Sequence, residues 1–182
     1  VLSSIIFGVG MLFISDGISR GFALEMFDNQ IKQHISQMQI HKMGYEKHKD
    51  VKKVIPKSKD LEKTLDGIKG INNFSKRSVV FGLLSSASSS SGCALIGIEP
   101  EKEKKITSIH ESIIAGKYFS KVNREIVIGK KMAEKLDVEI GDKLVATASD
   151  INGEVSNELF RVVGIYKASS NDFEKMYVYV PL

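Results

Sequence analysis

The segment Glu125–Leu136, EIVIGKKMAEKL, sets the pattern of the fold because a short strand is followed at once by a short helix. Its apolar start predicts a strand over Glu125–Ile128, and the residues after Gly129 predict a helix over Lys130–Leu136. A glycine turn follows within Val138–Asp142. The rest of the chain predicts three more strands, at Leu144–Ala148, Leu159–Tyr166 and Met176–Val180, the last alternating Tyr and Val before Pro181.

Two predicted hairpins join strands in this pattern. The residues Asp150-Ile151-Asn152-Gly153 connect Leu144–Ala148 to Leu159–Tyr166, and Asn-Gly is a strong short-range hairpin signal. Upstream, Ser78–Leu84 and Ala94–Ile98 predict an antiparallel pair joined by a flexible serine-rich tip at Ser85–Ser91.

The region between the hairpins predicts a helix over Ile106–Ile113, because Ile106, Ile109 and Ile113 share one helical face before Gly116. Short helices thus alternate with strands late in the chain. The fold class is therefore α+β, with a mixed sheet expected in the second half.

The N-terminus predicts one long helix. The run Val1–Ser15, VLSSIIFGVGMLFIS, carries no charge, and as a helix it would cover about 22 Å of the roughly 30 Å hydrocarbon core of a bilayer. Apolar residues then recur every four positions at Ala23, Phe27, Ile31 and Ile35. We expect the second half of a transmembrane helix that extends out of the bilayer to about Ile35. The start on Val1 rather than Met suggests that residues precede it. A signal peptide and a buried core helix remain alternatives.

The segment after this helix is rich in lysine. Gln37–Lys42 predicts a strand, and Ser58 is the expected N-cap of a helix that presents Leu61, Leu65 and Ile68. Eight lysines and four acidic residues lie between Lys42 and Lys63, with Tyr45 as the single aromatic residue. So few aromatic side chains argue against nucleic-acid binding, which leaves a solvated face or contact with lipid headgroups.

The composition is that of a globular protein without a recognisable catalytic set. The 182 residues are 42% hydrophobic and 26% charged with a net charge of +4, which excludes a disordered chain or a polytopic membrane bundle. The serine tract lacks a G-x-S-x-G elbow. His34, His41 and His48 are seven residues apart, which does not suit a metal site, and His110 stands alone. Cys93 is expected to be a buried thiol.

The phosphate-binding pattern is also incomplete. Gly129-Lys130-Lys131 follows a strand and opens a helix, but Arg124 stands where a Walker A motif needs its first glycine, and Lys131 replaces the final Ser or Thr. We therefore predict no catalytic, cofactor-binding or metal-binding residues, and a chain that is not an enzyme.

The order of the segments resembles a known family. After the N-terminal helix come ALIGIEP at Ala94–Pro100, IIAGKYF at Ile113–Phe119, EIVIGKKMAEKL at Glu125–Leu136, GDKL at Gly141–Leu144, FRVVGIY at Phe160–Tyr166 and YVYVPL at Tyr177–Leu182. This order is similar to that of the MacB/FtsX-like ABC transporter permeases, in their periplasmic core domain, and closest to the lipoprotein-releasing LolC/LolE-type branch.

The resemblance implies a two-part organisation and a location. Residues 1–35 would be the C-terminal part of a transmembrane helix with its periplasmic extension, and residues 36–182 a MacB-like core domain of two subdomains, incomplete at its C-terminus. One subdomain would begin at Ile126, and Ser58–Phe119 would lie largely in the other. The protein would sit in the bacterial inner membrane, with residues after about 20 on the periplasmic side.

The resemblance also implies a function and partners. The permease would couple cytoplasmic ATP hydrolysis to lipoprotein release or export, with the long helix transmitting movement. Its partners would be a cytoplasmic ABC ATPase subunit, a second permease subunit in a homo- or heterodimer, the lipid bilayer and a periplasmic lipoprotein carrier, with no nucleic acid and no cofactor. A MacB-type efflux or signalling permease and a membrane-anchored envelope-sensing domain are the alternatives.

One turn is the candidate partner contact. In the family's C-type subunits a long hook between the corresponding strands catches the carrier. Here a short turn replaces that hook, with five candidate residues: Asp150, Ile151, Asn152, Gly153 and Glu154. Replacing the connection from Ser149 to Ser156 with Gly-Ser is expected to leave any carrier binding unchanged.

Overall fold

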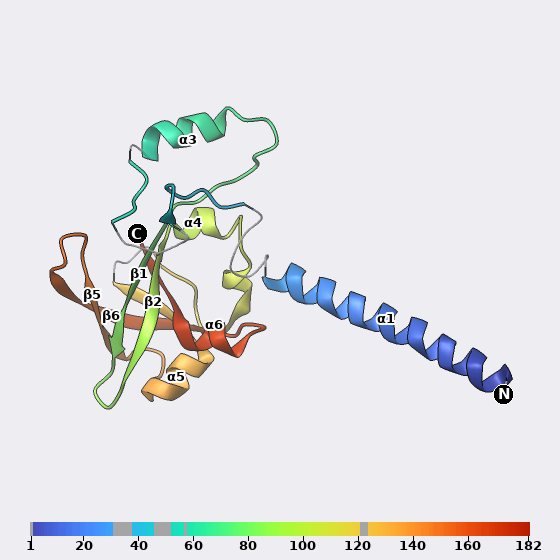
Figure 1. Ribbon diagram of the computed structural model, residues 1–182. Coiled ribbons are helices and arrows are strands. Elements are labelled where there is room, and N and C mark those ends of the chain that lie inside the picture. Colours follow the sequence, from blue (N-terminus) through green and yellow to red (C-terminus); the bar gives the residue numbers. More distant parts are fainter. Residues whose placement is uncertain (1, 31–37, 46–51, 57, 121–123) are drawn as a thin grey trace.

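A computed structural model describes residues 2–30, 38–45, 52–56, 58–120 and 124–182 (Figure 1). The first helix, α1 (Leu2–Gln30), is continuous and extends away from the remainder of the chain in Figure 1. Its apolar residues, among them Phe7, Leu12 and Phe13, are exposed along the helix. An ion pair one turn apart, Asp16 to Arg20 at 2.9 Å, lies near its middle. The predicted long helix is confirmed over this range, and its expected end at Ile35 lies outside the described residues.

The described helices do not include a membrane span, because none is both long enough and apolar enough to cross a bilayer.

The strands form a mixed sheet whose pairings close on themselves. Within the described residues the order is β3-β6-β4-β7-β2-β1-β5, and β5 pairs in turn with β6. The pairs β2–β7 and β4–β6 are parallel, while the others are antiparallel. The strands are β1 (Arg77–Ser85), β2 (Ser90–Ile98), β3 (Ile113–Gly116), β4 (Glu125–Gly129), β5 (Lys143–Ser149), β6 (Val155–Tyr166) and β7 (Tyr177–Pro181). The predicted α+β class and mixed sheet are confirmed.

Closure creates an interior that every strand of the circuit helps to fill. One buried cluster takes side chains from β1, β2, β4, β5, β6 and β7, and α5 (Lys130–Leu136) adds its own apolar face. The cluster includes Leu84, Cys93, Ile126, Ile128, Met132, Leu136, Leu144, Val162, Val178 and Val180. Burial of these aliphatic groups is the main force that holds the sheet closed.

A second cluster covers part of the outer surface. Ile96, Val127 and Tyr179 point outward from β2, β4 and β7, where Ile109 and Phe119 pack against them. Beside this cluster, α4 (Pro100–Glu103) places Glu103 in a buried position, where its carboxylate pairs with Arg77 of β1. The outer cluster includes Val163 and Tyr166 of β6 and, among the described residues, none of β5.

The sheet crosses the position near Ile126 at which one subdomain was expected to begin. β2 pairs with β7 and β1 pairs with β5, so the N-terminal hairpin belongs to the same sheet as β4–β7. The helix α3 (Ser58–Asp66) lies apart from this sheet, above it in Figure 1.

Most predicted elements are present. Helices α3 and α5 and strands β1, β2, β4, β5, β6 and β7 coincide with predicted segments, with shifted ends. β6 starts at Val155, four residues before the predicted start at Leu159. α5 ends at its predicted residue because Asp137 adopts the left-handed conformation at φ 53°, which stops the helix.

Two predictions are wrong. Residues 38–42, the described part of the strand predicted at Gln37–Lys42, have no strand structure. The helix predicted over Ile106–Ile113 is reduced to a 3-10 turn, η2 (Ile109–Ser112), after which β3 pairs with the end of β6. Pairing with β6 satisfies backbone groups across the sheet and outweighs the local helical periodicity.

The serine-rich tip is a hydrogen-bonded turn attached to α5. Ser86 Oγ donates to the carbonyl oxygen of Leu136 at 2.8 Å and accepts from the amide of Ser89 at 3.1 Å. Lys135 Nζ donates to Ser91 Oγ at 2.9 Å. The sequence predicts a flexible tip here, but the structure has a hydrogen-bonded turn. The turn is favoured because Ser86 satisfies a backbone carbonyl at the end of α5.

Candidate functional site

The predicted partner-contact turn is a tight loop closed by one carboxylate. Asp150 Oδ1 accepts the amide protons of Asn152 and Glu154 at 2.8 and 2.9 Å. The amide of Gly153 donates to the carbonyl of Asp150 at 3.1 Å, and Gly153 has the positive φ of 90° that this turn requires. The predicted hairpin is confirmed, and its loop is internally braced.

These hydrogen bonds also stabilise the charged form of the capping carboxylate. Donation from the Glu154 amide, together with donation from Asn152, lowers the pKa of Asp150 below its ordinary value of 3.8. The tip therefore carries a fixed negative charge, and Glu154 supplies a second carboxylate beside it. Ile151 lies at the same tip, and the residue is 56% exposed.

Behind the tip, the outer surface of β5–β6 carries exposed aliphatic side chains. Directly opposed residues of antiparallel strands point to one side of a sheet. Val145 opposes Leu159, Ser149 opposes Val155, and Leu83 of β1 opposes Thr147. We call the residues of this surface the hairpin face. Its apolar members are 37–67% exposed, and they are Phe81, Leu83, Val145, Val155 and Leu159.

A polar pair lies at the middle of the hairpin face. Thr147 Oγ1 donates to Asn157 Oδ1 at 2.6 Å across the two strands. The bond fixes both side chains, so the face presents a preorganised centre between its aliphatic rows.

The base of the hairpin, opposite the tip, carries basic side chains and a cavity. Lys143 opposes Arg161 at the base of the two strands, and Arg161 Nη1 donates to the carbonyl of Gly141 at 2.9 Å. Arg124 lies nearby with its Nε 3.6 Å from Glu158 Oε2. A cavity of about 220 Å³ opens here, lined by Arg124, Glu125, Lys143, Leu159, Phe160, Arg161 and Val163.

The buried acid of this cavity already has partners. The amide of Ser120 donates to Glu125 Oε2 at 2.7 Å, and the hydroxyl of Ser120 donates to the other carboxylate oxygen. The positive charge at the rim therefore comes from Lys143 and Arg161, together with Arg124, which pairs with Glu158.

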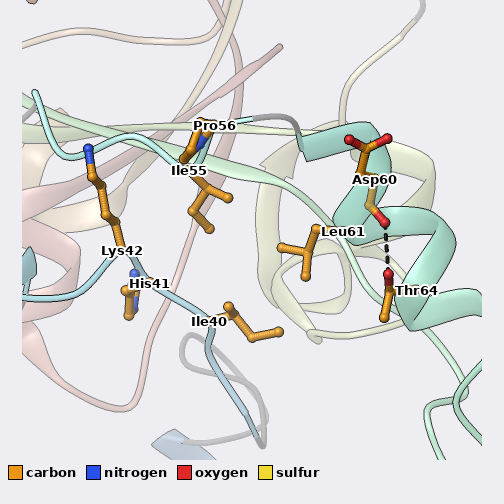
Figure 2. Close-up of a pocket in the computed structure, with 8 residues that line it drawn as sticks. All are labelled: Ile40, His41, Lys42, Ile55, Pro56, Asp60, Leu61 and Thr64. Carbon is orange, nitrogen blue, oxygen red and sulfur yellow. Dashed lines mark hydrogen bonds between the residues drawn. The ribbon is translucent and has the colours of Figure 1, made fainter.

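A larger open pocket lies between α3 and the segments before it. Its volume is about 440 Å³, and Figure 2 shows aliphatic side chains facing one another across it. Thr64 Oγ1 donates to the backbone carbonyl of Asp60 at 2.9 Å on one wall. The lining residues are Ile40, His41, Lys42, Ile55, Pro56, Asp60, Leu61 and Thr64. Such a lining suits an apolar group with a small polar end.

The polar residues considered for chemistry are dispersed. His41 stacks on Tyr45 with ring centroids 4.7 Å apart, whereas His110 lies beside Tyr118 at 6.1 Å. His34 and His48 are outside the described residues. No group of His, Cys, Asp or Glu suitable for a metal ion occurs in the part of the chain that the structure describes.

Cys93 is enclosed in the interior cluster, as predicted. Burial raises the pKa of its thiol to about 11, which keeps the thiolate scarce at neutral pH. A buried neutral thiol is a poor nucleophile, so the cysteine serves packing.

Sequence reasoning located the tip but not the face beside it. Val145 and Leu159 point to one side of the sheet, and their neighbours Leu144 and Phe160 point to the other. Because both sides carry apolar residues, the sequence does not show which side is exposed. The sequence signal that marks the exposed side is the charge at the two ends of the hairpin. Lys143 and Arg161 lie at the base, and Asp150 and Glu154 lie at the tip. Strand register is needed to join these residues into one surface.

The chain matches one protein family and is similar to a solved structure. The family model described as the MacB-like periplasmic core domain matches residues 1–182. Among solved structures, the extracellular domain of the noncanonic ABC-type transporter YknZ from Gram-positive bacteria is similar at 21% identity with a TM-score of 0.50. The match covers 65% of this chain and 59% of that one, and at this identity it supports the fold. No curated protein sequence matches the chain.

Proposed function

The chain belongs to the family of MacB-like periplasmic core domains of ABC transporter permeases, and from this we propose that it couples ATP hydrolysis by a cytoplasmic ATPase to movement outside the membrane. The observation that carries the proposal is the match of the family model to the whole chain, including α1. In this proposal the protein lies in the bacterial inner membrane, with residues after about 20 on its outer side.

The long helix would be the mechanical link. α1 runs unbroken from Leu2 to Gln30, a length of roughly 44 Å at 1.5 Å per residue. An unbroken helix resists bending because each turn is hydrogen-bonded to the next, so displacement at one end reaches the other. The projecting position of α1 in Figure 1 supports this role.

The closed sheet would receive that movement as one rigid unit. Side chains from six strands meet in the interior cluster, and close-packed interiors transmit strain with little deformation. The hairpin tip and the serine turn are both braced by internal hydrogen bonds. We propose that the domain moves as a body and acts through its surface.

For the transported cargo we propose lipoprotein release or export from the inner membrane, on the basis of the LolC/LolE-type order of segments. A periplasmic lipoprotein carrier would be the downstream partner. The connection from Ser149 to Ser156 is a short turn and not a long hook, so we expect carrier binding to survive its replacement by Gly-Ser. Loss of binding in that variant would show that the turn acts as a hook.

The experiment for the main proposal is affinity purification of the tagged protein from membranes of its own bacterium. We expect an ABC ATPase with a Walker A motif to co-purify and to be identified by mass spectrometry. A protein that is fully recovered outside the membrane fraction, without such an ATPase, would contradict the proposal.

The pocket in Figure 2 favours a second candidate, a domain that senses envelope ligands. Its volume of about 440 Å³ lies within the range of small-molecule sites, and Ile40, Ile55 and Leu61 give it aliphatic walls. Leu61→Asp would place a charge on one wall, and Ile68→Asp is the exposed control outside the lining. If sensing is the function, the first substitution abolishes saturable binding of an apolar probe and the second leaves it intact.

A further inference from the structure

We propose that a second copy of this chain docks on the hairpin face, with Ile151 of each copy inserted into the basic cavity of the other. The two copies would be related by a two-fold axis near the Thr147–Asn157 pair. This inference rests on the proposed function, because it identifies the contact between two permease subunits outside the membrane.

The hairpin face is apolar and exposed. Five aliphatic or aromatic side chains, each at least 37% exposed, lie side by side on β1, β5 and β6. Neighbouring exposed apolar groups mark contact surfaces, since covering them gains about 25 cal/mol per Å². The exposure of these five side chains shows that no other described part of the chain covers this surface.

The two ends of the hairpin carry opposite charges. Asp150 and Glu154 lie at the tip, whereas Lys143 and Arg161 lie at the base. The strand from Lys143 to Ser149 is seven residues long, which separates the two ends by about 20 Å. An antiparallel arrangement of two such hairpins brings each acidic tip against a basic base.

That arrangement has the symmetry of the commonest protein dimers. A two-fold interface uses the same patch on both partners, so the patch must be complementary to itself. A hairpin face with opposite charges at its ends and an uncharged middle meets this condition. Thr147 and Asn157 lie about midway between tip and base, where the axis would pass.

The hairpin tip matches the cavity at the base in size and in chemistry. The cavity of about 220 Å³ is smaller than the 300–1,000 Å³ typical of small-molecule sites. Leu159, Phe160 and Val163 provide apolar walls, and Arg124, Lys143 and Arg161 provide the basic rim. Ile151 is an exposed aliphatic residue between the carboxylates of Asp150 and Glu154. Its side chain suits the apolar walls of the cavity, and the two carboxylates suit the basic rim.

Charge reversal tests the proposal on the 182-residue chain in detergent, without any ATPase. Glu154→Lys and Lys143→Glu should each weaken dimerisation at least about tenfold in sedimentation velocity, because like charges would meet at both ends of the interface. The double variant should recover most of the loss, since each reversed tip then meets a reversed base. Lys105→Glu, an exposed reversal outside the hairpin, is the control.

A disulfide tests the geometry independently. Ile151→Cys with Leu159→Cys should give a covalent dimer on mild oxidation. Within one chain, the four residue steps from Val155 to Leu159 already span about 13 Å, too far for an internal bridge. The control pair is Ile151→Cys with Met176→Cys. Met176 is 46% exposed and Leu159 is 43% exposed, so the two cysteines are about equally accessible to oxidation. The control pair should stay monomeric on a denaturing gel.

The outcomes separate this inference from the proposed function. Unchanged dimerisation in both single reversals, or equal cross-linking of the two cysteine pairs, would overturn the hairpin interface even if an ATPase co-purifies with the unmodified protein. Rescue by the double reversal would support the interface. Absence of an ATPase would then count against the transporter function alone.

Discussion

Arg77 of β1 and Glu103 of α4 form an ion pair at the edge of the outer cluster, and the carboxylate is only 1% exposed. Thr107 Oγ1 donates to the same carboxylate at 3.0 Å, so both its charge and its hydrogen-bonding capacity are satisfied. The pair ties the segment that follows β2 back onto β1. It thereby positions η2 and the residues that cover the outer cluster.

Glu103→Ala should lower the free energy of unfolding by about 3 kcal/mol, because it leaves Arg77 and Thr107 without their shared acceptor. Glu101→Ala on the same helix is the matched control. Glu101 is 77% exposed and pairs with Lys104 at the surface, so its loss should cost less than about 1 kcal/mol. Urea unfolding of both variants makes the comparison, and equal losses would refute a special role for Glu103.

Gly129→Ala should destabilise the fold by about 1–3 kcal/mol through steric overlap. A Cβ at Gly129 would lie 2.2 Å from the carbonyl oxygen of Glu174 in α6 (Asn171–Met176), and backbone cannot withdraw as a flexible side chain can. Gly92→Ala in β2 is the control because a Cβ there meets nothing within 4 Å. Thermal melting should show a lower midpoint for the first variant only; a normal midpoint would mean that α6 shifts freely.

Ser86→Ala should cost about 1 kcal/mol, because it removes the hydroxyl that bonds to the carbonyl of Leu136 at the end of α5. Ser88→Ala, in the same turn, is the control, because it removes an exposed hydroxyl that lies 3.3 Å from Ser86 Oγ. Hydrogen exchange should show faster opening of the last turn of α5 in the first variant. Equal exchange in both variants would show that the serine turn does not hold the helix.

Asp150→Asn should reduce thermal stability at pH 7 more than at pH 3. The pKa of Asp150 is lowered below 3.8 in the folded chain, first by the amide of Glu154. A depressed carboxyl pKa stabilises the fold above the unfolded pKa, and this contribution is lost as pH falls through the folded pKa. Melting midpoints of both proteins from pH 7 to pH 3 measure the effect, and a constant difference between them would contradict the capping role.

The sequence predicts the parts of this fold in which local pattern and long-range pairing agree. Glu125–Leu136 is recovered because its apolar strand is buried by the sheet and its helix stops at Asp137. Ile106–Ile113 fails because β3 gains a partner in β6 that lies more than forty residues away in sequence. The helices α4 and α6, of four and six residues, are too short to show a helical period.

The candidate site divides in the same way. The turn Asp150–Gly153 is visible in sequence because Asn-Gly and a preceding Asp specify a local geometry. The hairpin face is not visible, since it needs the register that sets Val145 opposite Leu159 and Leu83 opposite Thr147. The cavity at its base depends on three separate segments, which only the folded sheet brings together.

The central claim is that ATP-driven movement passes through α1 to the folded domain. The most direct measurement is the distance between spin labels at Lys105→Cys on the two copies of the purified transporter, because Cys93 is buried and stays unlabelled. We predict that the distance distribution shifts when ATP and vanadate are added, and that Ile18→Pro in α1 abolishes the shift while the ATPase remains bound. An identical distribution with and without nucleotide in the unmodified helix would contradict the account.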